Sequence, residues 1–227
     1  MILEIKKELQ KVVDSERIYD VSKFFKTGKG QYSEYDKFLG LYMQDIRKIS
    51  KKFKNTNFQD LEILLNSEIH EERLLGIFIL IEQFPNDKDK IYNFYLKNIH
   101  AVNNWDLVDL SADKILGNYL LNKDKKLLYN FSKSNNLWKR RISIIATFAF
   151  IKNNRFKDTL KISEILLNDG HDLIHKSVGW MLREVGKKDQ KIEEKFLRKH
   201  YKTMPRTMLR YSIERFNKEK RKFYMKR

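Results

Sequence analysis

The sequence predicts an all-α protein, an α-solenoid built from HEAT-like pairs of helices. Apolar residues recur at three- and four-residue spacing over long segments, whereas strict alternation is scarce. Only two prolines and eight glycines interrupt the 227 residues. Similar segments also return at near-regular intervals, and each opens a long helix that a shorter helix precedes. These segments are 69–76, 103–110, 136–143, 173–180 and 204–211.

The apolar spacing places helices in order along the chain. In the first half we expect them at residues 2–14, 17–26, 37–53, 58–66, 69–84 and 88–98. In the second half we expect 104–121, 124–133, 136–152, 157–168, 172–186, 189–200 and 204–224.

Start and stop signals support the later helices. Asn104 and Asn136 are residue types that cap helix N-termini, and Gly170 ends the helix that precedes Asp172. Pro205 is tolerated in a first turn. We expect one HEAT-like domain over 1–227, with 1–57 as a less regular N-terminal cap.

The chain has no cysteine, which excludes disulfides, thiolate catalysis and Cys-based metal sites. The N-terminal segment has no long apolar run of the kind found in secretory signals. The longest apolar runs are too short to cross a membrane. We therefore expect a cytoplasmic protein, and the sequence gives no signal for dimers, so we expect a monomer.

Lys plus Arg number 47 against 30 Asp plus Glu, so the formal net charge is +17. Such an excess favours a polyanionic partner, most simply nucleic acid. A solubilising surface in a Lys-rich chain is the alternative, and charge alone does not separate the two.

A glycine-containing segment, Phe25 to Ser33, follows the second expected helix. It lacks the spacing of a nucleotide-binding P-loop, because no Ser or Thr follows Gly28–Lys29. Its amides, with Lys26 or Lys29, are candidates for holding a DNA phosphate. The other interpretation is an ordinary connection between helices.

Trp105 and Asp109 lie one turn apart on the helix expected at 104–121. Asp109 borders an apolar stripe, where a carboxylate is partly desolvated and needs a partner. It is either a functional group that faces a cation or one half of a structural ion pair. Asp106 and Asp113 lie further round the helix, and we expect them to be solvated.

Two later helices carry further candidates. Arg141 falls within an apolar stripe, so it is either paired or directed at a phosphate, whereas Arg140 points away. Trp180 lies off its stripe, where it either packs on the next repeat or forms a stacking platform. His171 and His175 are one turn apart, but no third ligand completes a metal site.

Several motifs together resemble the AlkD-type DNA alkylation repair family over nearly the whole chain. They are Phe25–Tyr32, His70–Arg73, Trp105–Asp109, Trp138–Arg141, Lys176–Trp180 and Met204–Thr207. The resemblance implies HEAT-like repeats that wrap DNA in a basic concave face. It also implies a glycosylase that removes positively charged N3- or N7-alkylated purines, such as 3-methyladenine and 7-methylguanine, and leaves the damaged base stacked.

The resemblance assigns roles to individual residues. Asp109 matches the family's catalytic carboxylate, Trp105 and Trp180 match the tryptophans that flank the lesion's deoxyribose, and Arg141 matches the arginine near the lesion phosphate. The chain departs from the family pattern at 33–36 and 41–47. Both departures fall in the N-terminal cap, where they bear on how DNA is engaged.

We therefore expect a monofunctional DNA glycosylase of base excision repair that acts on alkylated double-stranded DNA in the nucleoid. It needs no metal, nucleotide cofactor or membrane. One alternative is a non-catalytic binder of damaged or branched DNA, and another is a HEAT-type protein scaffold. The expected DNA-binding cations are Lys26, Lys29, Arg140, Arg183 and Arg206.

Overall fold

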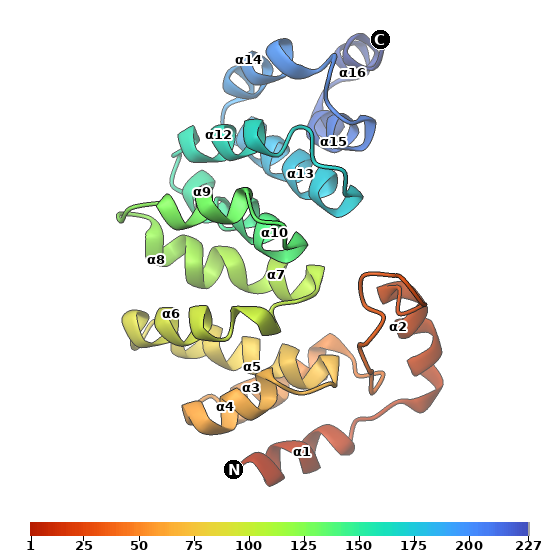
Figure 1. Ribbon diagram of the computed structural model, residues 1–227, viewed down its shortest axis with the longest axis vertical. Coiled ribbons are helices and arrows are strands. Elements are labelled where there is room, and N and C mark those ends of the chain that lie inside the picture. Colours follow the sequence, from red (N-terminus) through yellow and green to blue (C-terminus); the bar gives the residue numbers. More distant parts are fainter. Residues whose placement is uncertain (227) are drawn as a thin grey trace. The chain divides into compact units, whose positions relative to one another are not determined.

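The computed structural model describes residues 1–226, and its helical architecture confirms the predicted all-α class (Figure 1). Within these residues there is no β-strand, and a single parallel bridge joins Lys37 to Ile69. The chain forms two compact units, Met1–Ser111 and Ala112–Arg227, called unit 1 and unit 2 below. In each unit, short helices stack in a repeat-like arrangement.

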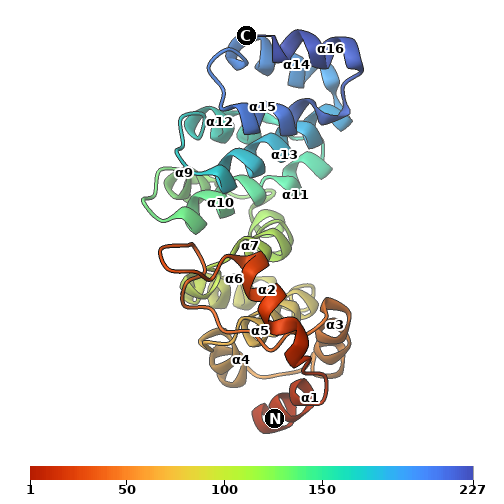
Figure 2. The same cartoon turned by 90° about the vertical axis from the view of Figure 1, so that its right-hand side faces the viewer.

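Unit 1 is built around one helix, α5. Its helices are α1 (Ile2–Gln10), η1 (Ser15–Arg17), α2 (Ile18–Phe25), α3 (Met43–Lys52), α4 (Phe58–Leu65), α5 (His70–Gln83), α6 (Lys88–Lys97), η2 (Ile99–Ala101) and α7 (Trp105–Ser111). α3, α4, α6 and α7 pack against α5, which buries every residue from His70 to Leu80. Figure 2 shows α2 in front of α5.

The helix expected at 37–53 begins six residues later, so that prediction was wrong at its start. The carboxylate of Glu71 on α5 accepts hydrogen bonds from the amides of Leu39, Gly40 and Leu41 at 2.9–3.2 Å. These bonds hold the segment before α3 outside a helix. Gly40 has φ +76°, and a Cβ there would lie 2.2 Å from the carbonyl oxygen of Asp14.

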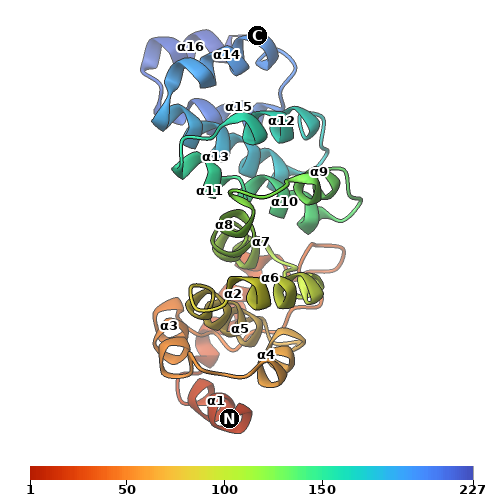
Figure 3. The same ribbon diagram turned by 90° about the vertical axis from the view of Figure 1, so that its left-hand side faces the viewer.

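Unit 2 is also built from short helices. Its elements are the π-helix η3 (Ala112–Gly117), α8 (Asn118–Leu120), α9 (Lys126–Ser132), α10 (Leu137–Ile145), α11 (Phe148–Lys152), α12 (Lys157–Ile165), α13 (Asp172–Lys188), α14 (Gln190–His200), α15 (Arg206–Ser212), η4 (Ile213–Arg215) and α16 (Lys218–Met225). Figure 3 shows α9, α10, α12 and α13 lying side by side, as their contacts require.

The long helix α13 lies at the centre of unit 2 and contacts α10, α12, α14 and α15. Its predicted apolar stripe is fully buried. Gly179 lies where α15 crosses, because a Cβ there would be 2.5 Å from both the Met208 carbonyl oxygen and the Tyr211 Cβ. Glycine at this position therefore sets how closely the two helices approach.

Three of the long helices predicted from the sequence are interrupted. Segment 136–152 divides into α10 and α11, and at the break the Thr147 hydroxyl donates to the Ile144 carbonyl oxygen at 2.7 Å. Segment 204–224 divides where Asn217 caps α16 through the Lys220 amide at 2.9 Å. Segment 104–121 passes through the π-helix η3. Apolar periodicity continues across such breaks and does not reveal them.

None of the helices in the described part of the chain is long and apolar enough to span a membrane. The expectation of a single repeat domain over 1–227 stays a prediction.

Candidate functional site

Trp105 and Asp109 lie one turn apart on α7, and both side chains are half-buried. Between them, Leu107 and Val108 have no exposed surface. At the start of the helix, the Asn104 side-chain oxygen accepts a hydrogen bond from the Trp105 amide at 2.8 Å. One side of α7 therefore presents an aromatic ring and a carboxylate at the boundary between core and solvent.

Asp106 and Asp113 are buried, so the prediction that they are solvated was wrong. Asp106 is 5% exposed and lies 2.8 Å from His70 Nε2, and Asp113 is 3% exposed and pairs with Lys152 at 2.6 Å. Each carboxylate faces a cationic partner on another helix. A helical wheel marks only the apolar side of a helix, so it does not reveal such partners.

His70 lies at the centre of a buried polar network beneath α7. Burial alone would lower the pKa of His70, but the adjacent Asp106 carboxylate and the hydrogen bonds to Asp106 and Asp36 raise it to about 9. The imidazolium therefore stays charged at neutral pH. Asp36 also accepts a 2.6 Å hydrogen bond from Arg73, and although burial opposes this, His70 and Arg73 hold the pKa of Asp36 below its usual value.

The same network ties the glycine-containing segment to α7. The Asn104 side-chain amide donates to the Ser33 hydroxyl at 2.7 Å and to the Asp36 carboxylate at 2.9 Å. Ser33 and Asp36 are the first and last residues of the stretch 33–36, where the chain departs from the family pattern. In this chain their side chains anchor that stretch to Asn104, the residue directly before Trp105.

Aromatic rings complete the surroundings of Trp105. Phe25 stacks on Trp105 with centroids 5.3 Å apart and an interplanar angle of 12°, and Phe24 meets the same ring edge-on at 5.8 Å. Phe25 also contacts Phe38 and His70. Sequence reasoning missed Phe24 and Phe25 as neighbours of Trp105, because the contact joins helices about eighty residues apart and no local pattern marks it.

Lys26 and Lys29 are exposed, and Lys26 adopts the left-handed conformation with φ 57°. The amides of Gly28 and Gly30 are hydrogen-bonded to the side chains of Gln31 and Glu34 at 3.1 and 2.9 Å. These amides therefore stabilise the turn, and the two lysines are the exposed cations of this segment. Their proposed contact with phosphate stays a prediction.

In unit 2, Arg141 is 5% exposed and donates a hydrogen bond to the carbonyl oxygen of Leu173, at the start of α13. Arg140 is tied down by a 2.6 Å ion pair with Asp169 and by the carbonyl oxygens of Ser134 and Asn135. These contacts give Arg140 a structural role. A DNA contact by Arg140 stays a prediction.

Trp180 is half-buried on α13, off the apolar stripe as predicted. Its indole N–H donates to Glu184 at 3.2 Å, and its ring lies 5.9 Å from that of Phe148. Glu184 fixes the edge of the indole. Arg183 bridges to Glu214, so this expected DNA-binding arginine also joins α13 to η4.

Arg206 is exposed, and its guanidinium donates to the Met225 carbonyl oxygen at 2.9 Å. His171 and His175 lie one turn apart, but their ring nitrogens bond to the Leu173 amide and the Asp169 carbonyl oxygen. Within residues 1–226, no group of three or more His, Cys, Asp or Glu side chains is arranged to hold a metal ion.

The charge is divided very unevenly between the two units. Unit 1 contains 17 Lys plus Arg and 18 Asp plus Glu, whereas unit 2 contains 30 and 12. The net charges are therefore −1 and +18. Unit 2 carries the attraction for a polyanion, together with Arg141 and Trp180, while unit 1 supplies Trp105 and Asp109. That these four residues converge on one lesion stays a prediction.

The comparisons with known proteins give one family match. The model of a family described as DNA alkylation repair enzyme matches residues 5–216. No curated protein matches the chain.

Solved structures share the fold at low sequence identity. A predicted DNA alkylation repair enzyme from Enterococcus faecalis has a TM-score of 0.72 and 15% identity, over 91% of this chain and 97% of the other. AlkD2 from Streptococcus mutans has a TM-score of 0.54 and 18% identity, over 88% and 97%. The smu.31 protein from Streptococcus mutans UA159 has a TM-score of 0.53 and 20% identity, over 75% and 89%.

Proposed function

Because the chain belongs to the DNA alkylation repair enzyme family, and its role therefore lies in DNA repair, we propose that it is a DNA N-glycosylase. Its proposed substrate is duplex DNA carrying positively charged N3- or N7-alkylated purines. The reaction is hydrolysis of the bond between the alkylated base and the deoxyribose. Such a protein acts on the nucleoid, without strand cleavage.

One observation carries this proposal: Asp109 lies half-buried one turn after Trp105, on the same side of α7. Alkylation gives the purine a positive charge, which makes it a good leaving group. As the bond breaks, positive charge develops on the sugar. A fixed carboxylate stabilises that charge and positions the attacking water.

The two tryptophans would also stabilise the positive charge that develops on the sugar. The face of an indole attracts a cation through its quadrupole, worth about 0.5–2 kcal/mol. Phe25 covers part of the Trp105 ring and limits how it can turn. Glu184 limits Trp180 in the same way. Each ring is therefore held within its own unit, and a ring that is already ordered loses less conformational freedom when it meets the substrate.

The test is release of 3-methyladenine or 7-methylguanine from methylated DNA by the full chain. We expect release by the natural sequence and a loss of about a hundredfold or more in Asp109→Asn, by analogy with the removal of a single preorganised electrostatic group. Glu82→Gln, at an exposed position of α5, is the matched control and retains full release. Equal release by Asp109→Asn would exclude the proposed role.

A second candidate is a non-catalytic binder of damaged or branched DNA, and the net charge of +18 in unit 2 favours it, because that charge supports binding without any chemistry. This candidate predicts salt-sensitive DNA binding with no base release. A protein scaffold predicts weak DNA binding even at low salt. Binding and release measured on one preparation therefore separate the three functions.

A further inference from the structure

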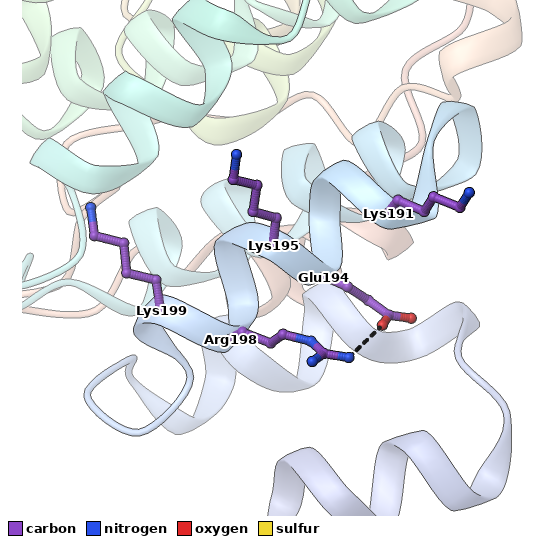
Figure 4. Close-up of a pocket in the computed structure, with 5 residues that line it drawn as sticks. All are labelled: Lys191, Glu194, Lys195, Arg198 and Lys199. Carbon is purple, nitrogen blue, oxygen red and sulfur yellow. Dashed lines mark ion pairs between the residues drawn. The ribbon is translucent and has the colours of Figure 1, made fainter.

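The exposed face of α14 carries a row of cations that the functional site does not use. Lys191, Lys195 and Lys199 follow one another at four-residue steps, about 6 Å apart along the helix axis. Arg198 lies beside them, and with Glu194 these residues line a shallow open cavity of about 540 Å³ (Figure 4).

This face points away from the helix that carries Trp180. α14 packs against α13 and buries Glu193, Phe196 and Leu197. Lys191, Lys195, Arg198 and Lys199 are all exposed, on the solvent side of the helix. The row therefore forms a surface of unit 2 separate from the Trp180 side of α13.

The positive charge of this face is only weakly offset. Glu194 pairs with Lys220 of α16 and lies 3.9 Å from Arg198. Burial, reinforced by the neighbouring charge of Glu194, raises the pKa of Glu193 to about 9, so this carboxyl group is neutral at neutral pH.

Lys199 pairs with Glu164 at 2.8 Å. Among residues 1–226, Lys191 and Lys195 have no ion-pair partner. A cationic surplus therefore remains on the outer side of α14.

We propose that the α14 face binds the phosphate backbone of a second DNA segment, distinct from the segment that meets Trp180. The cations spread over two helical turns, as an extended polyanion requires. A small anion would instead need converging, buried donors. No aromatic ring lines this cavity, so it offers phosphate contacts without base readout. The protein would then hold two stretches of duplex at once.

The experiment uses two short undamaged duplexes with different fluorophores, and energy transfer between them reports bridging by the full chain. The test variant replaces Lys191, Lys195, Arg198 and Lys199 with Gln. The control variant removes the same charge from exposed positions of unit 1, namely Lys7, Lys51, Lys54 and Lys88.

We expect the natural sequence and the control to bridge the duplexes, and the α14 variant to lose the energy transfer while it still binds one duplex. For binding of the second duplex, the slope of log affinity against log salt concentration should become less steep by about 3 to 4 when four phosphate contacts are lost. Circular dichroism checks that each variant is folded. Lys195→Glu, which reverses one charge of the α14 face, should also weaken bridging.

Three results would overturn the proposal. They are no energy transfer with the natural sequence, equal loss in both variants, and a loss of first-duplex affinity that matches the loss of bridging. The last would make the α14 face part of a single DNA footprint. Because the duplexes are undamaged, a protein without base release can still show bridging, so the inference and the proposed function fail separately.

Discussion

The imidazole of His70 lies 2.8 Å from the carboxylate of Asp106, and this contact joins α5 to the first turn of α7. Asp106 directly follows Trp105, so the position of the tryptophan depends on a charge pair in the core. The side chains of His70 and Asp106 are 2% and 6% exposed. A buried pair of this kind is strongly destabilising when one partner alone is removed.

The first prediction concerns the stability that this pair provides. His70→Gln should lower the free energy of unfolding at pH 6 by about 3–5 kcal/mol, because Asp106 and Asp36 lose their buried cationic partner. The pKa of His70 rises on folding from about 6.5 to about 9. Its stabilisation is therefore complete below pH 6.5 and disappears as pH rises through 9.

Urea unfolding at pH 6 and pH 9.5 measures both effects. The difference in unfolding free energy between the natural sequence and His70→Gln should shrink at the higher pH. His100→Gln, at an exposed histidine that bonds Asn66, is the matched control and should change little. A difference that is the same at both pH values would contradict a charged His70.

The second prediction concerns Glu193 in unit 2. This residue is 2% exposed, and its Oε1 has no hydrogen-bond partner within the described chain. Because burial raises its pKa to about 9, the folded state keeps a proton that the unfolded state releases above about pH 4.5. This group should therefore make stability fall as pH rises from 4.5 to 9.

Glu193→Gln removes this titration and retains the shape of the side chain. We expect the variant to match the natural sequence in thermal stability near pH 4.5 and to exceed it at pH 8. Melting curves at both pH values provide the measurement. A variant that loses stability equally at both would show that Glu193 is ionised and paired in the fold.

The sequence predicted the helical class and the buried stripe of α13 correctly, because amphipathic periodicity is a local property of the chain. The stripe of α13, from Ile174 to Val185, is buried as predicted, and Trp180 lies off it. Arg141 is buried within its stripe and hydrogen-bonded, which is one of the two interpretations that its position left open.

The parts that sequence reasoning missed depend on contacts between distant segments. Glu71 holds the amides of Leu39 to Leu41 thirty or more residues away, so the expected helix at 37–53 begins late. Phe25 meets Trp105 through the tertiary fold alone. Asp106 lies off the apolar stripe of its helix, which is typical of a surface residue. Its burial is explained by the contact with His70, which is distant in the sequence.

The third prediction concerns the crossing of α13 and α15. Gly179→Ala places a methyl group about 2.5 Å from the Met208 carbonyl oxygen, which is backbone and cannot move aside easily. Overpacking of this kind costs about 1–3 kcal/mol, more than the roughly 1 kcal/mol that Ala gains over Gly within a helix. We expect a lower melting temperature.

Gly170→Ala is the matched control for this substitution. Nothing lies within 4 Å of a Cβ at Gly170, which precedes α13, so that variant should melt close to the natural sequence. If Gly179→Ala were the more stable of the two, the close approach of α15 to α13 would be disproved.

The fourth prediction tests whether Phe25 positions Trp105. Phe25→Leu retains apolar volume but removes the ring that stacks on Trp105 with centroids 5.3 Å apart. An aromatic pair is worth about 0.5–1.5 kcal/mol beyond its buried area, so base release should slow by roughly 2- to 10-fold. Because Trp105 would meet the sugar as the bond breaks, the loss should appear in kcat more than in KM.

Tyr19→Leu is the control, because Tyr19 lies on the same helix, α2, and is 74% exposed. It should leave both kcat and KM unchanged. A melting temperature for each variant separates positioning from general destabilisation: a slower kcat in Phe25→Leu at temperatures where the protein is fully folded assigns the effect to Trp105. A loss confined to KM would instead make Phe25 a contributor to DNA binding.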